Sequence, residues 1–472
     1  MPETSKPSLI TVILAAGKGT RMNSSRPKVL QNLRGRSLTH YTLDLARSMS
    51  SDRILMILGH QADLVRADVQ SAYPGIEYVV QEPQMGTGHA LLQCLPQLKG
   101  FEGNVQVLSG DVPALTASTL KNLLQSQTST GAEIAVLTSH PPDPTGYGRM
   151  IRNPAGDIVA IREQKDLNQG EGDIGEINTG VYIFDAGFLV RELPLLSDNN
   201  AQGEYYLTDL VEAAAAGGMT VSAFTLEDPD EALGINTLLE LSAMEKRMRD
   251  DTLRKLMESG VRVVDPAVTY VDESVQVEAD AVLHPMTFLY GTTRIGSGTV
   301  IHPGAVISNS IIGRDVEIFP HSVIEDSQIL ENTVIGPFAR LRPGNSIGPR
   351  GKIGNFVEVK NSRLGEGSKV SHLTYIGDSQ LGKNVNVGAG SVTCNYDGFS
   401  KHRTVLEDGV FVGSGTMMVA PVTLGSNSIV GAGSTITEDV PPDSLALGRA
   451  RQEVKEGWAK RWREKIARKG KS

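Results

Sequence analysis

An aliphatic residue recurs every six positions, with occasional steps of five, through most of the C-terminal half of the chain. The series starts at Val271, breaks between Thr393 and Leu406, and then resumes as far as Ile436. A six-residue period is typical of one short strand and one tight turn per repeat, so that three repeats close a triangular coil. Stacked coils bury the aliphatic column as a continuous core. The sequence therefore predicts a parallel β-helix in this half.

The segment before the repeat has a different rhythm. Apolar runs such as RILMILG, VQVLSGD, AEIAVLT and GVYIFD alternate with helical stretches such as SLTHYTLDLARSM and GHALLQCLPQL. This alternation favours an α/β domain, Rossmann-like with a mainly parallel sheet. The stretch that joins the two halves reads as a long amphipathic helix. We expect a first domain over residues 1–236, a linker helix over 237–260, the β-helix over 261–448 and a basic tail over 449–472.

Composition limits the kind of protein. The chain has 472 residues, too many for one ordinary core, and a net charge of -9, which argues against a general nucleic-acid binder. Its two cysteines, Cys94 and Cys394, lie far apart and form no metal-binding spacing, which suits a reducing compartment. The sequence has no run of apolar residues long enough to cross a bilayer. We expect a cytoplasmic protein without nucleic-acid or membrane partners.

A glycine-containing loop follows the first apolar run. The sequence LAAGKGTRM, residues 14–22, fits neither a Walker loop nor a dinucleotide fingerprint. Glycines nevertheless let backbone N–H groups approach a phosphate, and Arg21 and Lys28 would add positive charge. An ordinary turn with solvated basic residues is the alternative reading of this loop.

Several motifs then occur in a fixed order along nearly the whole chain. They are LAAGKGTRM with Lys28, QMGTGHA, LSGDVP, DPTGYGRM, EINTG, NAQGEYYLTD, GNFVEVK, HLTYIGD and TCNYDG. This series resembles the family of bifunctional enzymes that are both N-acetylglucosamine-1-phosphate uridyltransferases and glucosamine-1-phosphate acetyltransferases. The resemblance implies a left-handed β-helix, a homotrimer, and synthesis of UDP-N-acetylglucosamine for peptidoglycan and the cell wall. The implied substrates are glucosamine 1-phosphate, N-acetylglucosamine 1-phosphate, UTP and acetyl-CoA.

Uridyl transfer brings its own anionic nucleophile, a sugar phosphate. It therefore requires charge neutralisation and alignment rather than a strong base. Arg21 and Lys28 suit that catalytic task. Asp111 lies where a strand ends and could hold Mg²⁺, although an Asp before Val-Pro is also a common turn residue. The resemblance adds Asn236 as the second metal ligand. It also implies the residues that bind UTP and the sugar nucleotide: Leu14, Ala15, Ala16, Gly17, Lys28, Gln81, Gly86, Thr87, Ser109, Gly110, Asp111, Gly148, Glu163, Asn178 and Asn236.

Acetyl transfer needs a base that titrates near neutrality, because a sugar ammonium must lose a proton before it attacks a thioester. His372 is the candidate, with a structural histidine as the alternative. Counting from the aliphatic column places His372 and Ala389 on one face in neighbouring coils. The extra segment CNYDGFSKHR interrupts the period beside them, and such an insertion indicates a binding role.

The resemblance also supplies the binding residues of this second site. The residues that match sugar-phosphate ligands are Arg342, Lys360, Tyr375, Asn386, Asn395 and Tyr396. The residues that match acetyl-CoA contacts are Ala389, Ser414, Ala432 and Arg449. Gly415 departs from an acidic residue found in several relatives, so no carboxylate partner is expected there.

Two other readings of the whole chain remain open. The protein could be a single-activity sugar-phosphate nucleotidyltransferase whose β-helix serves only assembly or regulation, or a trimeric scaffold in which neither site works. The tail carries Trp458 and Trp462 four residues apart among many basic residues. Their aromatic face could pack on the same subunit, or the tail could reach the cofactor site of a neighbouring copy.

Overall fold

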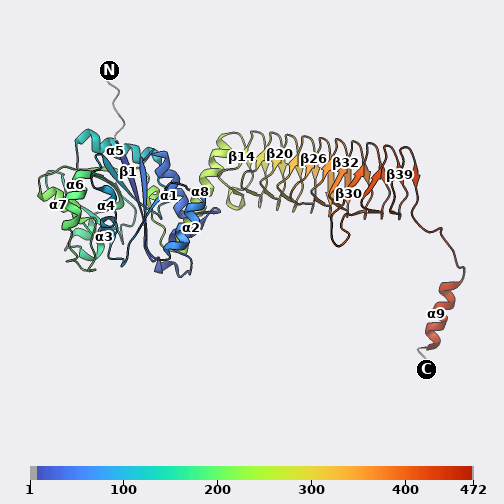
Figure 1. The fold of residues 1–472 in the computed structure, drawn as a ribbon, viewed down its shortest axis with the longest axis horizontal. Helices are drawn as coiled ribbons and strands as arrows, with labels where there is room; N and C mark the ends of the chain where they lie inside the picture. Colours follow the sequence, from blue (N-terminus) through green and yellow to red (C-terminus); the bar gives the residue numbers. More distant parts are fainter. Residues whose placement is uncertain (1–7, 470–472) are drawn as a thin grey trace, which may run out of the picture. The chain divides into compact units, whose positions relative to one another are not determined.

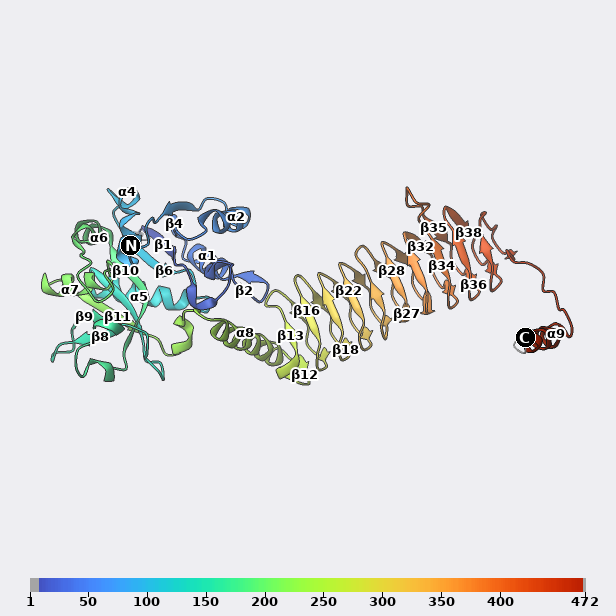
Figure 2. The same cartoon turned by 90° about the horizontal axis from the view of Figure 1, so that it is seen from below.

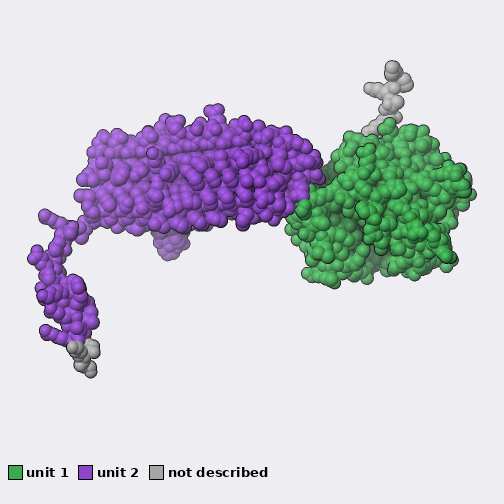
Figure 3. All heavy atoms as spheres, turned by 180° about the vertical axis from the view of Figure 1, so that it is seen from behind, with its two compact units in different colours: residues 1–248 green, residues 249–472 purple. Residues whose placement is uncertain are grey.

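The computed structural model describes residues 8–469 (Figure 1). Residues 1–7 and 470–472, at the outer ends of the expected first domain and tail, lie outside the described residues. The chain divides into two compact units, residues 1–248 and 249–472 (Figure 3). Each unit is described separately below.

The first unit is built on one mixed sheet. Its central strands follow the order β11-β7-β10-β6-β1-β4-β5, and β10 runs antiparallel to both β6 and β7. The other neighbours in this order are parallel. The strands are β1 (Leu9–Ala15), β4 (Arg53–Leu58), β5 (Glu77–Val80), β6 (Asn104–Ser109), β7 (Ile134–Ser139), β10 (Ile177–Asp185) and β11 (Val221–Thr225). The predicted α/β domain with a mainly parallel sheet is confirmed.

Helices cover both faces of this sheet (Figure 1). One buried cluster joins it to α3 (Thr87–Leu92), α4 (Leu95–Leu98), α6 (Ala186–Glu192) and α7 (Asp209–Ala216). The other joins it to α1 (Leu38–Ser48), α2 (Ala62–Ala72) and α5 (Ala117–Thr130). The stretch GHALLQCLPQL, expected as one helix, forms α3 and α4 instead. Pro96 stands in the first turn of α4, where its missing N–H costs nothing.

The second unit is a β-helix of three parallel sheets (Figure 2). The first sheet runs from β12 (Arg262–Val263) to β41 (Leu445–Ala446). The second runs from β13 (Tyr270–Val271) to β40 (Thr435–Ile436), and the third from β14 (Gln276–Val277) to β38 (Val422–Leu424). The aliphatic residue of each repeat points inward, and one continuous cluster joins these side chains along the unit. The predicted left-handed parallel β-helix of hexapeptide repeats is confirmed.

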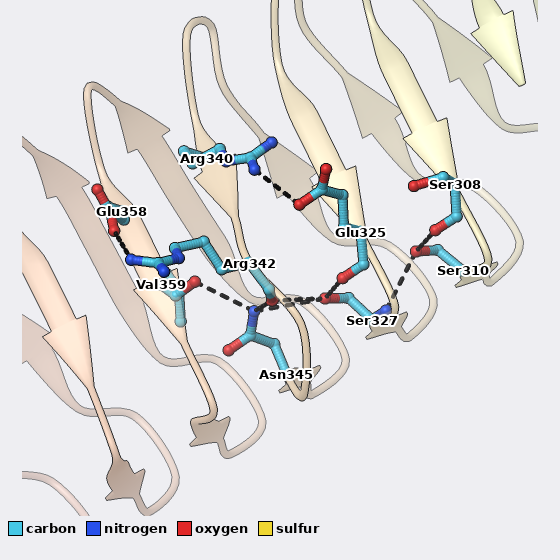
Figure 4. Close-up of polar contacts among 9 residues, drawn as sticks. All are labelled: Ser308, Ser310, Glu325, Ser327, Arg340, Arg342, Asn345, Glu358 and Val359. Carbon is cyan, nitrogen blue, oxygen red and sulfur yellow. Dashed lines mark hydrogen bonds and ion pairs between the residues drawn. The ribbon is translucent and has the colours of Figure 1, made fainter. Parts of the chain in front are cut away.

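Polar side chains at one corner of the coils satisfy buried backbone groups (Figure 4). The Ser327 backbone N–H donates to the Ser310 hydroxyl at 3.1 Å, and the Ser310 hydroxyl donates to the Ser308 carbonyl at 2.7 Å. The Asn345 amide continues the series by donating to the Val359 carbonyl at 3.2 Å. Buried N–H and C=O groups are costly when they lack partners. These hydroxyl and amide groups therefore let the turns pack without water.

The regular coils are interrupted once between β34 (Val392–Cys394) and β35 (Thr404–Leu406), where the intervening residues leave the coils as a loop (Figure 1). Two further helices lie outside the sheets, α8 (Leu238–Glu258) and α9 (Trp458–Lys469). The division between the two units falls within α8. Within residues 8–469, none of the helices has the length and apolar content that a bilayer crossing requires.

Strand β23 (Gln328–Ile329) offers a matched test of the core column. Ile329 is fully buried, and its neighbour Gln328 points outward. We expect Ile329→Ala to lower the free energy of unfolding by about 2–5 kcal/mol, because it leaves a cavity between stacked coils. Gln328→Ala should change it by less than about 0.5 kcal/mol. Urea unfolding followed by the β-sheet circular dichroism signal measures both, and equal losses would contradict the packing described here.

Candidate active sites

A cavity of about 310 Å³ opens where β1 and β6 end. Leu14 of β1 pairs with Ser109 of β6, so the loops that follow these two strands meet. Ligands of open α/β sheets bind at this edge. Ten of the residues predicted to bind UTP line the cavity: Leu14, Ala15, Ala16, Gly17, Lys28, Gln81, Gly86, Thr87, Ser109 and Asp111.

A second cavity of about 200 Å³ adjoins the first. The two share Leu14, Thr87, Ser109 and Asp111 in their walls. The second cavity is also lined by three further residues of the predicted set, Glu163, Asn178 and Asn236. The fold thus provides two adjoining compartments with Asp111 in the wall of each, an arrangement that suits two reactants that meet at one phosphate.

Four polar side chains converge beside Asp111. The Lys28 ammonium forms an ion pair with the Asp111 carboxylate and donates a hydrogen bond of 2.9 Å to Asn236 Oδ1. The Arg21 guanidinium donates to the same amide oxygen at 2.7 Å. The Ser109 hydroxyl donates to the other Asp111 oxygen. Asp111 is 7% exposed, so little water screens its own contacts with Lys28 and Ser109.

The same cluster has the chemistry of a cation site. A carboxylate oxygen of Asp111 and the amide oxygen of Asn236 both face the Lys28 ammonium. Two oxygen donors of this kind fit Mg²⁺, which usually takes one or two protein ligands and completes its shell with substrate phosphates and water. Among the described residues, no group of three or more His, Cys, Asp or Glu side chains forms a complete metal cage. The residues therefore fit a metal that is shared with a bound phosphate.

The glycines of this region permit close approach. Gly19 has a φ of +61°, and a Cβ there would lie 2.5 Å from the Lys28 Cβ. Gly86 has a φ of +100°, and a Cβ there would lie 2.6 Å from the Tyr205 carbonyl oxygen. The Gly86 carbonyl accepts a hydrogen bond of 3.0 Å from the Gln81 amide, which fixes that side chain beside the first cavity. Larger residues at either glycine would displace these elements.

Gly110, Gly148 and Arg21 complete the predicted set without lining either cavity. Gly110 donates its N–H to the Leu14 carbonyl at 2.9 Å, which ties the two strand ends together. Gly148 accepts the Asn178 N–H at 2.9 Å. Arg21 reaches the site through Asn236, as described above. The structure therefore brings every predicted residue of the first site into one region.

Several acidic groups around the second cavity have altered pKa values. Burial raises the pKa of Glu163, although the Thr208 hydroxyl that donates to it at 3.2 Å opposes this shift. Burial and the nearby Glu212 carboxylate raise the pKa of Asp209 to about 6. Sequence reasoning did not single out Thr208, although it lies within the motif NAQGEYYLTD. Its position at the start of α7 gives it a direct contact with Glu163.

The second candidate site lies on the β-helix. Strands β30 (Lys369–His372), β33 (Asn386–Val387), β36 (Phe411–Val412) and β39 (Ile429–Val430) are successive neighbours in one sheet. Their register aligns Val370, Val387, Val412 and Val430. The residues two positions after these valines are therefore stacked in successive coils: His372, Ala389, Ser414 and Ala432. The spacing predicted for His372 and Ala389 is confirmed.

Small residues make the wall beyond His372 flat. Gly415 donates its N–H to the Ala389 carbonyl at 2.7 Å, and Gly433 donates to the Ser414 carbonyl at 2.8 Å. The Arg449 guanidinium donates to the Ala432 carbonyl at 2.8 Å. A long, narrow ligand could lie along this wall with its anionic end near Arg449.

A cluster of basic side chains lies on the neighbouring sheet. Lys360 ends β28 (Glu358–Lys360), and its pKa is lowered mainly by the Lys401 ammonium, with a further contribution from Arg342. Arg342 also forms an ion pair of 3.1 Å with Glu358 (Figure 4). Lys401 lies on the loop that interrupts the coils and was missed in the sequence analysis. Three cations that influence one another in this way would suit a polyvalent anion.

The interrupting loop is tied to the coils by its first residue. Asn395 is buried and donates a hydrogen bond of 2.5 Å to the Asp378 carboxylate. Its amide nitrogen and the Tyr375 hydroxyl both lie close to Gly377, within 2.7 Å of the position that a Cβ would take there. Tyr396 is 61% exposed and pairs with Lys401 across the loop. The predicted loop residues therefore lie beside the basic cluster.

Asn386, predicted to bind the sugar phosphate, lies at the start of β33 and pairs with Lys369 of the preceding coil. A residue that sequence reasoning missed lies on the other side of β30. Asn355 ends β27 (Lys352–Asn355), and its Oδ1 lies 2.7 Å from His372 Nδ1. Asn355 lies within the motif GNFVEVK, but the motif gave no indication of a contact with His372.

The tail of the described chain is helical from Trp458 to Lys469. Trp458 and Trp462 stack with ring centroids 5.4 Å apart, so the predicted common face is confirmed. Both side chains are about half exposed.

The fold and the two sites define a transferase of two domains, a nucleotidyltransferase followed by a hexapeptide-repeat transferase. Residues 11–169 match the model of the MobA-like NTP transferase domain, and residues 403–438 match the bacterial transferase hexapeptide model of six repeats. The chain belongs to the GlmU family of bifunctional proteins. It is 45% identical to the bifunctional protein GlmU of Pelobacter propionicus, over 97% of this chain and 99% of the relative. The corresponding protein of Geotalea uraniireducens is 46% identical over 96% and 98%, and that of Nostoc sp. is 44% identical over 96% and 99%.

Asp209 generates a prediction of pH-dependent stability. Its pKa of about 6 in the folded protein lies above the usual 3.8. The folded state therefore holds this proton longer than the unfolded state, and stability falls as the pH rises from about 4 to about 6. Asp209→Asn removes this loss and should stabilise the first unit at pH 7.5 by roughly 1–2 kcal/mol after allowance for solvent screening.

Urea unfolding followed by the helical circular dichroism signal checks this result at several pH values. The stabilisation by Asp209→Asn should become smaller as the pH falls from 6 toward 4. Asp63→Asn makes the same chemical change at an exposed carboxylate of α2, which is not a cause of the Asp209 shift, and it serves as the matched control. A gain that is independent of pH would contradict the assignment to Asp209.

Proposed function

We propose that the chain catalyses two consecutive reactions in the synthesis of UDP-N-acetylglucosamine. The β-helix transfers an acetyl group from acetyl-CoA to glucosamine 1-phosphate. The first domain then transfers a uridyl group from UTP to N-acetylglucosamine 1-phosphate and releases pyrophosphate. Two separate sites in one chain support this assignment. The first site has a cation cluster at strand ends, and the second has an imidazole on a flat wall. We assign the reactions to residues 1–236 and 261–448, joined by a helix over 237–260 and followed by the tail over 449–472.

For uridyl transfer, the sugar phosphate oxygen attacks the α-phosphorus and pyrophosphate leaves from the opposite side. The required contribution is alignment and neutralisation of charge. Lys28 and Arg21 already lie within hydrogen-bond reach of one oxygen, so their positive ends point into the region where phosphates would meet. Gln81 and Thr87 line the first cavity and offer polar groups for the uracil edge, whereas Asn178 lines the second and suits the N-acetyl sugar.

We propose Mg²⁺ as the metal of this site, held by Asp111 and Asn236. When bound, the ion screens phosphate charge and orients phosphate oxygens. The Lys28 ammonium contacts both ligand residues in this structure. A small cation held by the same two residues would take the position of this ammonium. Lys28 would then turn toward the phosphates that the bound substrates bring.

For acetyl transfer, His372 Nε2 accepts a proton from the sugar ammonium. The free amine attacks the thioester carbonyl, the carbon–sulfur bond breaks, and the departing thiolate takes up the second proton, which the attacking nitrogen loses as the amide forms. His372 then returns its proton to solvent. Arg342, Lys360 and Lys401 supply positive charge for the phosphate of the sugar. The stacked small residues with Arg449 beyond them suit the pantetheine arm and the phosphates of acetyl-CoA.

We also propose a homotrimer located in the cytoplasm. Exposed apolar side chains on the β-helix, among them Phe338 at 48%, Phe356 at 55% and Leu373 at 63%, support association of copies through this unit. Cys94 and Cys394 are free thiols, which agrees with a reducing compartment.

One coupled assay tests the two activities together. Thiol release from acetyl-CoA is followed after addition of glucosamine 1-phosphate, and pyrophosphate is followed in the same tube after addition of UTP and Mg²⁺. We expect thiol first and pyrophosphate second without any added N-acetyl sugar. If pyrophosphate appears only when N-acetylglucosamine 1-phosphate is supplied, the protein has a single activity and the β-helix serves assembly.

Asp111→Asn should lower kcat/KM for uridyl transfer on the order of 100-fold or more, because a neutral amide holds a cation less strongly than a carboxylate. Acetyl transfer should stay at the wild-type rate. Pyrophosphate release at several Mg²⁺ concentrations measures the effect. Asp63→Asn makes the same chemical change at an exposed position of α2 and serves as the control. Wild-type Mg²⁺ dependence in Asp111→Asn would refute the proposed metal role.

His372→Ala should abolish the proton transfer and lower kcat for acetyl transfer by about 10²–10⁴-fold, while uridyl transfer continues. Thiol release and pyrophosphate release from supplied N-acetylglucosamine 1-phosphate measure the two activities separately. His321→Ala removes another exposed histidine of the β-helix and should leave both activities unchanged. Loss of both activities in His372→Ala would contradict the independence of the two sites.

A further inference from the structure

The strands that carry His372 and Asn355 are longer than most of their neighbours in the sheet. Strands β27 and β30 each have four residues, whereas β24 (Val334–Ile335) and β33 have two. The extra residues extend the pairing so that Asn355 lies directly beside His372. The regular hexapeptide geometry is therefore modified at the coil of the imidazole and at the coil before it.

The contact between the two side chains determines the state of the ring. Asn355 Oδ1 lies 2.7 Å from His372 Nδ1. An amide oxygen can only accept a hydrogen bond, so Nδ1 must carry the proton and Nε2 must carry the lone pair. This is the tautomer in which Nε2 can accept a proton from a substrate. We propose that Asn355 is a positioning residue that holds His372 in this tautomer, an inference that rests on the acetyl transfer proposed above.

The backbone on both sides of the pair is fixed. The Leu373 N–H donates to the Asn355 carbonyl at 3.0 Å, and the Thr374 hydroxyl donates to the His372 carbonyl at 2.6 Å. Gly354 allows the two coils to approach, because a Cβ there would lie 1.9 Å from the Ser371 carbonyl oxygen. The backbone of Asn355 is therefore held beside that of His372.

A neutral acceptor suits the reaction better than a charged one. The imidazole must be free of its extra proton before it can deprotonate the sugar ammonium. A carboxylate beside Nδ1 would favour the imidazolium form and oppose that step. The Asn355 amide orients the ring without adding charge. The charged side chains on the same two strands are Lys352 of β27 and Lys369 of β30, and β33 contributes no titratable side chain.

Removal of this amide gives a direct test. Asn355→Ala should lower kcat for acetyl transfer by about 10- to 100-fold, while KM for glucosamine 1-phosphate stays within about threefold. Uridyl transfer should be unchanged, and an unchanged β-sheet circular dichroism signal shows that the β-helix is folded. The ¹⁵N signals of the His372 ring, identified by their absence in His372→Ala, should lose the Nδ1–H tautomer. Asn332→Ala, at an exposed asparagine of an earlier coil, should change none of these quantities.

Two further variants separate positioning from a structural role. Asn355→Asp keeps an acceptor oxygen and should restore the Nδ1–H signal. In the His372→Ala background, Asn355→Ala should cause no further loss, because a residue that acts through the imidazole has no effect without it. Full kcat in Asn355→Ala, or an unchanged ring tautomer, would overturn the proposal. Absence of thiol release from the wild-type protein would overturn the acetyl transfer instead, and the ring signals would still report on the contact.

Discussion

Parallel backbone hydrogen bonds between successive coils control the position of the groups on the coils of the second unit. Each strand pairs with the strand one full coil later, and the aliphatic residue of each pair is directed inward. Because the pairing is continuous, a residue that lies a given number of positions after its aliphatic residue is stacked on its counterpart in the next coil. His372, Ala389, Ser414 and Ala432 form one column for this reason. The core and the candidate acetyl transfer site thus depend on the same register.

The first unit positions its site by another rule. Parallel strands bring their carboxyl ends to one edge, and the loops after β1 and β6 meet there. The Lys28 side chain then lies between Asp111 and Asn236, which are distant in the sequence. The cluster contains two cations, a carboxylate and an amide, and its Lys28–Asp111 ion pair is largely shielded from water. It is suited to hold phosphates, whereas the β-helix site is suited to move a proton.

Much of this organisation could be predicted from the sequence. The six-residue period predicted the coils and the stacking of His372 on Ala389, because inward aliphatic residues must repeat wherever the core continues. The motifs predicted residues that meet at the two cavities. The contact between Asn355 and His372 could not be predicted, because it depends on the local lengthening of β27 and β30. The position of Lys401 depends on the conformation of a loop without a repeat. The break between α3 and α4, in contrast, could have been predicted from Pro96, which begins a new helix instead of continuing one.

The two sites also differ in how tightly they constrain their key groups. In the proposed uridyl transfer, Lys28 would exchange its contacts with Asp111 and Asn236 for contacts with the substrate phosphates. The imidazole of His372 has a fixed partner in Asn355, on a backbone that its neighbours hold in place. A site that neutralises charge needs cations that can follow the moving phosphates, whereas a site that transfers one proton needs one nitrogen in one orientation. A long lysine side chain at the start of a short 3₁₀ helix and a histidine on a regular coil would meet these two requirements within a single chain.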